Sequence, residues 1–345
     1  MKLRLFFVII FNLLIIQAGT PAQLKEIARS DKLWTGVAVS KEGRIFVNYP
    51  RWSLETSISV AELSLAGETK PYPDPDWNQW SPELDPTNHF ICVQSVYIDS
   101  DNFLWVLDPA NSLFQGVVEG GAKLLKIDLS SNQVIQNIVF DTTLAPPHSY
   151  LNDVRVDVDR NFAYLTDSGL GAIVVVDLSS GISQRVLQNH PSTRAEDITL
   201  NIEGVTLNIK VHSDGLALTP DKNYLYYQAL SGRKLYRIAT RFLRDPAPTE
   251  SSLSDKVEFV TESGACDAIE FDPQGYLYLS SLELNAIRRY TPTGKIEMVI
   301  QDSSLKWPDS FSITPDGTVY VTTSQLHLAN SRTEPYKIFQ IVLDK

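Results

Sequence analysis

A pattern of alternating apolar and polar positions recurs six times along the chain. Each copy begins with a polar residue, continues with apolar residues at every second position, turns, and ends in a second apolar segment. The copies begin at Thr35, Gln94, Asn152, Asp214, Asp267 and Asp309. A period of two predicts β-strands, and the turns KEGR, DPQG and TPDG contain the Gly, Asp and Pro residues that tight turns need. Each copy is therefore predicted to form a β-hairpin.

The six copies also share an aromatic position and further apolar segments. The aromatic residue lies eleven or twelve positions after each start: Phe46, Trp105, Tyr164, Tyr226, Tyr278 and Tyr320. A third apolar segment follows most hairpins, and five of the six copies have enough residues for a fourth strand. Units of three to four strands that repeat about every fifty residues are typical of β-propellers. The sequence predicts an all-β fold, a six-bladed β-propeller, in which these aromatic residues pack between blades.

The two ends of the chain are expected to close the ring. The last copy lacks one strand after Leu343, and the segment Leu24–Ser30 precedes the first copy without a blade of its own. If this segment adds the missing strand, an exposed sheet edge disappears. Two stretches interrupt the repeats, Gly67–Phe90 and Gln188–Lys210, and the second contains an alternating run that predicts a separate hairpin. Both precede a blade's first strand, so we expect them over the central channel.

The amino-acid composition and net charge limit the classes of protein to which this chain can belong. The chain has 345 residues, of which 43% are hydrophobic and 21% charged, with a net charge of −11. These values predict a folded core and argue against a nucleic-acid partner. Lys2 and Arg4 precede an apolar run, Leu5–Ile16, and small residues follow it. This pattern predicts a signal peptide over residues 1–22, a secreted protein without a stable membrane anchor, and one propeller domain over residues 23–345. The alternative, a retained anchor, requires a longer apolar run.

The six residues that begin the copies are the principal candidates for chemistry. Each enters the innermost strand of its blade, so the symmetry of a propeller brings all six to one channel mouth. Their oxygen atoms are ligands that Ca²⁺ and Mg²⁺ prefer. We therefore expect one divalent cation held by Asn152, Asp214 and Asp267, with Thr35, Gln94 and Asp309 completing the ring as ligand-binding residues. The alternative is a polar channel filled with water. We find no sequence pattern for a nucleotide or organic cofactor.

A second group of residues is expected around this ring. Tyr49, Trp52, Arg233 and Trp307 are predicted to bind a ligand. His212 lies two residues before Asp214 and is a candidate catalytic residue beside Asp214 and Asp267, because histidine titrates near neutral pH. The alternative for His212 is a hydrogen bond within its loop. Cys92 and Cys266 belong to opposite blades, so both are expected to be free thiols.

Several longer segments resemble a known family. They are GVAVSKEGRIFVNYPRW, PYPDPDWNQW, LWVLD, NDVRVD with AYLTDSG, HPST and DGLALTPDKNYLYYQALSGRKLY. This ordered set resembles the Yellow/major royal jelly protein family, and most of all its microbial, dopachrome-tautomerase-related branch. The resemblance covers nearly the whole mature chain and implies a secreted propeller with a small-molecule site. Activities in the family range from ligand binding to tautomerisation, and its eukaryotic members usually carry more cysteines than this chain.

The chain is more distantly similar to the senescence-marker/gluconolactonase propellers, which hold one divalent metal over the channel. Their ligands imply metal roles for Asn152, Asp214 and Asp267, but Thr35 stands where those enzymes have a Glu. Three functions remain open from the sequence. The first is an enzyme that hydrolyses a lactone with a metal, or that isomerises or cyclises an oxidised aromatic. The second is a non-catalytic binder of small amines or aromatic ligands, and the third is a structural secreted protein. The oligomeric state is left open.

Overall fold

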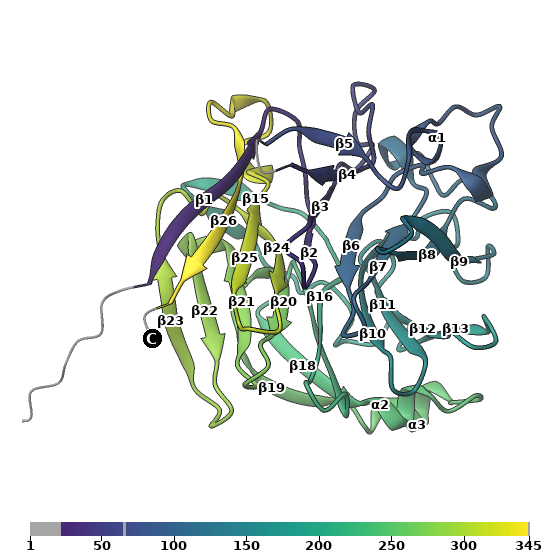
Figure 1. Ribbon diagram of the computed structural model, residues 1–345. Coiled ribbons are helices and arrows are strands. Elements are labelled where there is room, and N and C mark those ends of the chain that lie inside the picture. Colours follow the sequence, from purple (N-terminus) through teal and green to yellow (C-terminus); the bar gives the residue numbers. More distant parts are fainter. Residues whose placement is uncertain (1–21, 65–66, 344–345) are drawn as a thin grey trace, which may run out of the picture.

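Six four-stranded antiparallel sheets surround a central axis in the computed structural model, which describes residues 22–64 and 67–343 (Figure 1). The first three sheets, from the axis outward, are β2 (Val37–Val39), β3 (Ile45–Asn48), β4 (Val60–Leu63) and β5 (Thr69–Pro71); β6 (Ser95–Ile98), β7 (Phe103–Asp108), β8 (Lys123–Asp128) and β9 (Gln133–Val139); and β10 (Leu151–Asp157), β11 (Phe162–Asp167), β12 (Ala172–Asp177) and β13 (Ser183–Val186). The next two are β16 (Ser213–Leu218), β17 (Tyr224–Ala229), β18 (Lys234–Ala239) and β19 (Glu258–Glu262); and β20 (Cys266–Phe271), β21 (Leu277–Ser281), β22 (Ala286–Tyr290) and β23 (Ile296–Gln301). The predicted six-bladed β-propeller is confirmed.

The sixth blade joins the two ends of the chain. It consists of β24 (Pro308–Ile313), β25 (Val319–Thr323), β26 (Tyr336–Val342) and β1 (Gln23–Ser30). β1 pairs antiparallel with β26, with Leu24 opposite Ile341 and Ser30 opposite Tyr336. Figure 1 shows the two strands side by side. The predicted closing strand is therefore confirmed, and its pairing covers the edge that β26 would otherwise expose.

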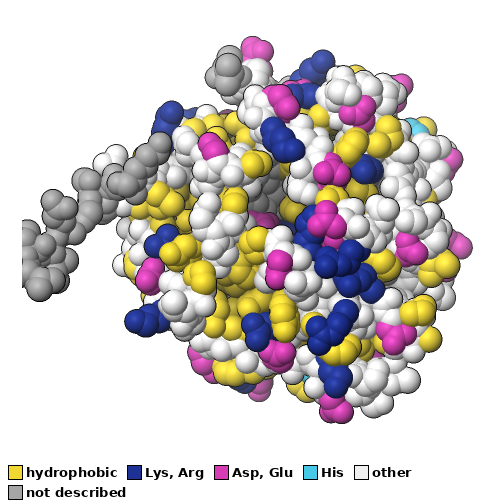
Figure 2. Space-filling view, turned by 60° about the horizontal axis from the view of Figure 1, so that its bottom comes forward, with side chains coloured by type: hydrophobic (Ala, Val, Ile, Leu, Met, Phe, Trp, Pro, Cys, Tyr) yellow, Lys and Arg dark blue, Asp and Glu magenta, His cyan; other side chains and the backbone are white. Residues whose placement is uncertain are grey.

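The core lies between neighbouring blades. Phe46, Trp105, Tyr164 and Tyr278 are fully buried, as the repeated aromatic position predicts. Trp105 packs with Val154 and Leu165 of the next blade, and its indole N–H donates to the Asp99 carboxylate at 2.8 Å. On the surface, acidic and basic side chains are mixed with apolar ones on the face seen in Figure 2.

The two interrupting stretches behave differently. The expected hairpin forms as β14 (Leu200–Ile202) and β15 (Val205–Leu207), and Leu207 lines a cavity over the channel, as predicted. The expectation for Gly67–Phe90 is wrong, because its strand β5 is the outermost strand of the first blade. Its aromatic residues pack outside the channel, since Tyr72 contacts Phe46 and Trp77 contacts Phe90. Apolar side chains in this stretch therefore extend the core between blades one and two.

Helices are few and short. They are α1 (Pro75–Asn78), α2 (Thr240–Leu243) and α3 (Glu250–Ser254), with 3-10 helices η1 (Pro86–Asn88), η2 (Ser112–Phe114), η3 (Leu282–Leu284) and η4 (Leu326–Ser331). Within residues 22–64 and 67–343, no helix is long and apolar enough to cross a membrane. The predicted signal peptide, residues 1–22, lies outside the described residues except for Ala22. Cys92 and Cys266 are both buried and free, as predicted.

Candidate functional site

A cavity of about 550 Å³ lies at the channel mouth, on the face that carries the β14–β15 hairpin. Five of the six residues that begin the repeats line it: Gln94, Asn152, Asp214, Asp267 and Asp309. The last four belong to the innermost strands β10, β16, β20 and β24. Thr35 is placed differently, because its hydroxyl donates to the backbone oxygen of Gln94 and accepts from Asn48 Nδ2. The fold thus gathers residues that are more than 200 positions apart in the sequence.

The carboxylates of Asp214 and Asp267 form the centre of this mouth cavity. The side chains of the two residues hydrogen-bond to each other and are 3% and 9% exposed. Asn152 Nδ2 donates to Asp214 Oδ2 at 3.0 Å, and Trp307 Nε1 donates to Asp267 Oδ2 at 2.6 Å. Gly215 permits this approach of strands β16 and β20, since a Cβ atom there would lie 2.6 Å from the backbone oxygen of Asp267.

Burial and mutual repulsion change the acidity of this cluster. Burial raises the pKa of Asp267 to about 7, while hydrogen bonds from Trp307 and Asp214 oppose the rise. Burial, with the negative charges of Asp267 and Asp309, raises the pKa of Asp214 well above its ordinary value. Burial and the charge of Asp267 also raise the pKa of Asp309 well above its ordinary value. The cluster therefore binds protons more tightly than ordinary carboxylates do, and it can hold protons at neutral pH.

Asp153 is a fourth carboxylate near the ring, and it is not among the site residues predicted from the sequence. Its negative charge contributes to the raised pKa values of all three ring carboxyls. Arg155 holds it with a 2.8 Å ion pair and also contacts Glu270 at 2.7 Å. Asp153 could have been identified from the sequence, because it is an acidic residue that directly follows the ring residue Asn152. Asp153 therefore adds to the negative charge around the ring.

Hydrogen bonds engage all three side chains that were expected to hold a divalent cation. Asn152 turns its amide nitrogen, a donor, toward Asp214, and one oxygen of Asp267 accepts the Trp307 N–H. Thr35 contacts backbone instead of the channel. Throughout the part of the chain that the structure describes, no group of three or more His, Cys, Asp or Glu side chains is arranged to hold a metal ion. The ring is organised as a hydrogen-bonded acid cluster.

An aromatic wall stands beside the acid cluster. Trp52 lines the cavity as predicted, together with Phe114 and Tyr150, which are not among the site residues predicted from the sequence. The Phe114 ring lies 5.5 Å from Trp52 and 5.4 Å from Tyr150, and Trp52 Nε1 donates to the Tyr150 hydroxyl at 2.5 Å. That hydroxyl donates to Gln94 Oε1 at 3.0 Å. Tyr150 lies two residues before Asn152, and Trp307 lies two residues before Asp309. A comparison of equivalent positions in the repeats could therefore have identified Tyr150.

Three other predicted site residues lie away from the mouth cavity. His212 is buried, and its Nδ1 accepts a hydrogen bond from the backbone N–H of Ala195 at 2.9 Å. The alternative expected from the sequence, in which His212 makes a hydrogen bond within its loop, therefore describes this residue. Burial lowers its pKa. Arg233 forms a bidentate ion pair with Glu283. Tyr49 lines a neighbouring cavity between the first and last blades. Among the residues predicted to surround the ring, Trp307 contacts the acid cluster directly through Asp267.

The β14–β15 hairpin covers part of the mouth. Leu200 and Ile202 pack with Trp307 in one apolar cluster. At the hairpin tip, Glu203 accepts hydrogen bonds from Asn285 Nδ2 and His327 Nε2, both at 2.8 Å. The hairpin therefore joins blades five and six above the ring. This cover keeps the carboxylates buried and supports their raised pKa values.

Comparison with known proteins identifies the family. Residues 91–342 match the family described as Major royal jelly protein, which is more than half of the chain. The chain belongs to the major royal jelly protein family. Protein yellow of Drosophila guanche is 24% identical in an alignment of 259 residues that covers 68% of this chain and 45% of that protein. The chain therefore corresponds to less than half the length of that relative, and the family resemblance seen in the sequence is confirmed.

Two solved structures have folds similar to that of this member of the family. A gluconolactonase from Xanthomonas campestris is 13% identical, with a TM-score of 0.59 over 93% of this chain and 90% of the other. Regucalcin from Agrobacterium tumefaciens, described as a calcium-binding protein, is 15% identical, with a TM-score of 0.58 over 93% and 94%. At these identities the likeness shows the shared fold, which confirms the more distant similarity predicted from the sequence.

Proposed function

We propose that this protein is a secreted enzyme that binds a small molecule at the channel mouth and moves protons to and from it. The observation that carries the proposal is the hydrogen-bonded pair of buried carboxyls, Asp214 and Asp267, at the floor of a 550 Å³ cavity. Cavities of this size suit small ligands. A carboxyl that exchanges its proton near neutral pH is suited to general acid–base catalysis.

The two carboxyls have different roles in this proposal. Asp267 accepts a proton from the bound molecule, and the Trp307 N–H keeps its accepting oxygen in place. Asp214, protonated and held by Asn152, donates a hydrogen bond to its neighbour and returns a proton at a second atom of the substrate. One proton is removed and one is supplied, so the net reaction is an isomerisation. The proton left on Asp267 then passes to Asp214 across the hydrogen bond between the two carboxyls, which restores the starting state. The covering hairpin limits the access of water to the transfer.

The aromatic wall indicates the substrate class. Phe114 is 62% exposed although it contacts Trp52 and Tyr150, so its ring offers a face for stacking. Planar aromatic molecules stack well on such faces. An oxidised aromatic compound, whose tautomers differ by the position of one proton, fits both the wall and the acid pair. Hydrolysis of a lactone is the second candidate reaction, favoured by the likeness to the gluconolactonase fold, and Asp267 would then deprotonate the attacking water.

The decisive experiment measures turnover of a panel of quinonoid aromatics and of lactones by purified protein, with and without EDTA. Asp267→Asn retains an acceptor for the Trp307 N–H, so it tests proton transfer with little change in shape. We expect turnover to fall by at least about 100-fold. The exposed variant Asp101→Asn is the matched control and should keep full turnover. Wild-type rates for Asp267→Asn would refute the proposed role of Asp267.

The same panel separates an enzyme from a binder. Ligands that bind without conversion, with affinity unchanged by Asp267→Asn, would favour the non-catalytic binder of small amines or aromatic ligands. Loss of turnover with EDTA, restored by Ca²⁺ or Mg²⁺, would show that a divalent cation takes part. Either result would contradict the metal-free acid–base proposal.

Secretion rests on the N-terminal sequence pattern and is tested separately. Cleavage after Ala22 would leave strand β1, which begins at Gln23, intact for ring closure. Mass spectrometry of the protein recovered from a secreting host should find a mature N-terminus after Ala18 or Ala22. Recovery of only the uncleaved chain in the membrane fraction would contradict secretion and favour the retained anchor.

A further inference from the structure

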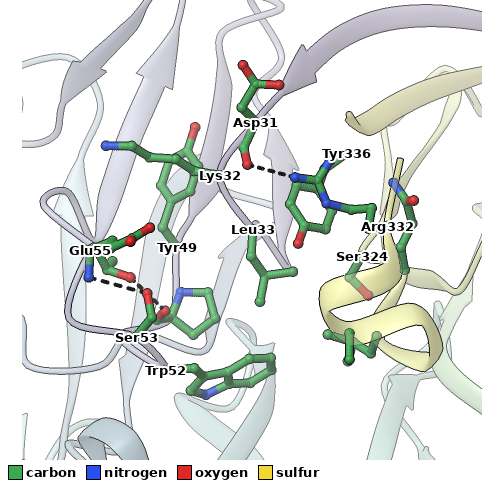
Figure 3. Close-up of a pocket in the computed structure, with 15 residues that line it drawn as sticks. Asp31, Lys32, Leu33, Tyr49, Trp52, Ser53, Glu55, Ser324, Arg332 and Tyr336 are labelled. Atoms are coloured by element: carbon green, nitrogen blue, oxygen red, sulfur yellow. Dashed lines mark hydrogen bonds between the residues drawn. The ribbon is translucent and has the colours of Figure 1, made fainter. Parts of the chain in front are cut away.

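A second cavity, of about 510 Å³, lies beside the mouth cavity between the first and last blades. Its walls come from the segment before β2, the loop after β3, and the loop between β25 and β26 (Figure 3). Trp52 and Leu326 line both cavities, so they stand between this side cavity and the acid cluster. The side cavity thus adjoins the mouth but has its own lining.

Charged side chains of both signs surround the side cavity: Asp31, Lys32, Glu55 and Arg332. In Figure 3, Lys32 and Glu55 lie on one side and Arg332 on the other. Among the ion pairs of the described residues, none involves any of these four side chains. Lys32 Nζ donates to Ser57 Oγ at 3.0 Å. The cavity therefore presents acids and bases that do not neutralise one another by contact.

Arg332 is held in a fixed position. Its guanidinium donates to the backbone oxygens of Glu334 and Asp31 and lies over the Tyr336 ring, 4.2 Å from the ring centroid. These contacts pair some of the guanidinium N–H groups with neutral partners. Among the described residues, no carboxylate forms an ion pair with Arg332. A guanidinium placed in this way is suited to a carboxylate ligand.

Gln325 supplies an independent indication of a ligand. It lines the side cavity, is only 4% exposed, and adopts a left-handed backbone conformation with φ of 51°. Its Nε2 donates to the backbone oxygen of Pro335 at 2.9 Å. Its Oε1 is buried and has no hydrogen-bond partner among the described residues. Buried acceptors without a partner are uncommon and unfavourable, and a ligand N–H would satisfy this one.

We infer that the side cavity binds a small zwitterion, a molecule with one ammonium group, one carboxylate and an aromatic or apolar side chain. Arg332 binds the carboxylate, and Glu55 on the facing side binds the ammonium group. The Gln325 Oε1 atom accepts an N–H of the ligand, while Trp52 and Tyr336 contact its side chain. This site uses none of the ring carboxyls, so it does not depend on the proposed reaction.

Three probes that share a phenyl side chain but carry different charged groups test this inference by isothermal titration calorimetry: L-phenylalanine has an ammonium and a carboxylate group, phenethylamine only the ammonium group, and 3-phenylpropionate only the carboxylate. The zwitterion should bind at least about tenfold more tightly than either singly charged probe, because each of those lacks one of two charge-assisted contacts. Absence of L-phenylalanine binding, or equal affinity for all three probes, would overturn the inference.

Variants assign each contact. Glu55→Gln should weaken L-phenylalanine about tenfold and leave 3-phenylpropionate unchanged, and Glu55 is exposed, so the change does not endanger folding. Arg332→Gln should weaken L-phenylalanine similarly and leave phenethylamine unchanged, which also shows that this variant is folded. The exposed control Glu83→Gln and the ring variant Asp267→Asn should bind L-phenylalanine like the wild type. Loss of binding in Asp267→Asn would place the zwitterion in the mouth and overturn the assignment.

Discussion

Replacement of Asp267 by Asn should change how the stability of this protein depends on pH. The raised pKa of Asp267 means that the folded chain binds this proton more tightly than the unfolded chain. Such a group stabilises the folded state at low pH, and this stabilisation is lost as pH rises through the folded pKa. This pH dependence of stability is opposite to that of an ordinary ion-paired carboxylate, whose contribution to the stability of the folded state is lost as pH falls.

The magnitude follows from the size of the pKa change. A rise from 3.8 to about 7 is about three pKa units. At 1.36 kcal/mol for each unit, the wild type loses up to about 4 kcal/mol between pH 4 and pH 8 because of this group. Asp267→Asn cannot ionise, so it avoids this loss, and it also removes a negative charge that disfavours ionisation of Asp214. We expect the variant to be about 2 to 4 kcal/mol more stable than the wild type at pH 8.5.

Urea unfolding at pH 4.5 and pH 8.5, followed by tryptophan fluorescence, measures this difference. At pH 4.5 the two proteins should agree within about 1 kcal/mol, because Asp267 is protonated in the folded wild type. The control Asp101→Asn alters an exposed carboxylate and should match the wild type at both values of pH. A stability difference between Asp267→Asn and wild type that is equal at both values of pH, or a less stable variant at pH 8.5, would refute the reasoning.

Four further predictions test the fold and the site. Deletion of residues 23–30 removes β1 and exposes the edge of β26, so the melting temperature should fall by about 10 °C, and no change in a thermal scan would contradict ring closure. Alkylation under denaturing conditions without reductant should label both Cys92 and Cys266, and mass spectra without labels would show a disulfide. Phe114→Ala should weaken binding of planar aromatics at least about fivefold with almost no change in melting temperature. Millimolar Ca²⁺ or Mg²⁺ should leave the wild-type melting temperature unchanged. If the ions instead raise it, and Asp214→Ala abolishes that rise, the result would support the predicted cation site.

The repeat by itself determined the architecture of this protein. Six copies with a period of two and an aromatic residue in register can bury their apolar faces only against one another, which a ring of blades achieves. The unpaired segment Leu24–Ser30 and the incomplete last copy together predicted the closing strand. The ring positions followed from the same symmetry, so Asn152, Asp214, Asp267 and Asp309 could be placed at one mouth without any coordinates.

Only the tertiary structure decided what these residues do there. Whether a polar side chain faces a channel, a backbone oxygen or a neighbouring side chain depends on its rotamer and on contacts from distant segments, which sequence spacing does not encode. Thr35 therefore contacts Gln94 and His212 contacts Ala195, although both occupy promising sequence positions. The acidity of Asp267 likewise depends on burial beneath a hairpin and on a hydrogen bond from Trp307, forty residues away. Such effects arise from proximity in space, and so they appear only when the chain is folded.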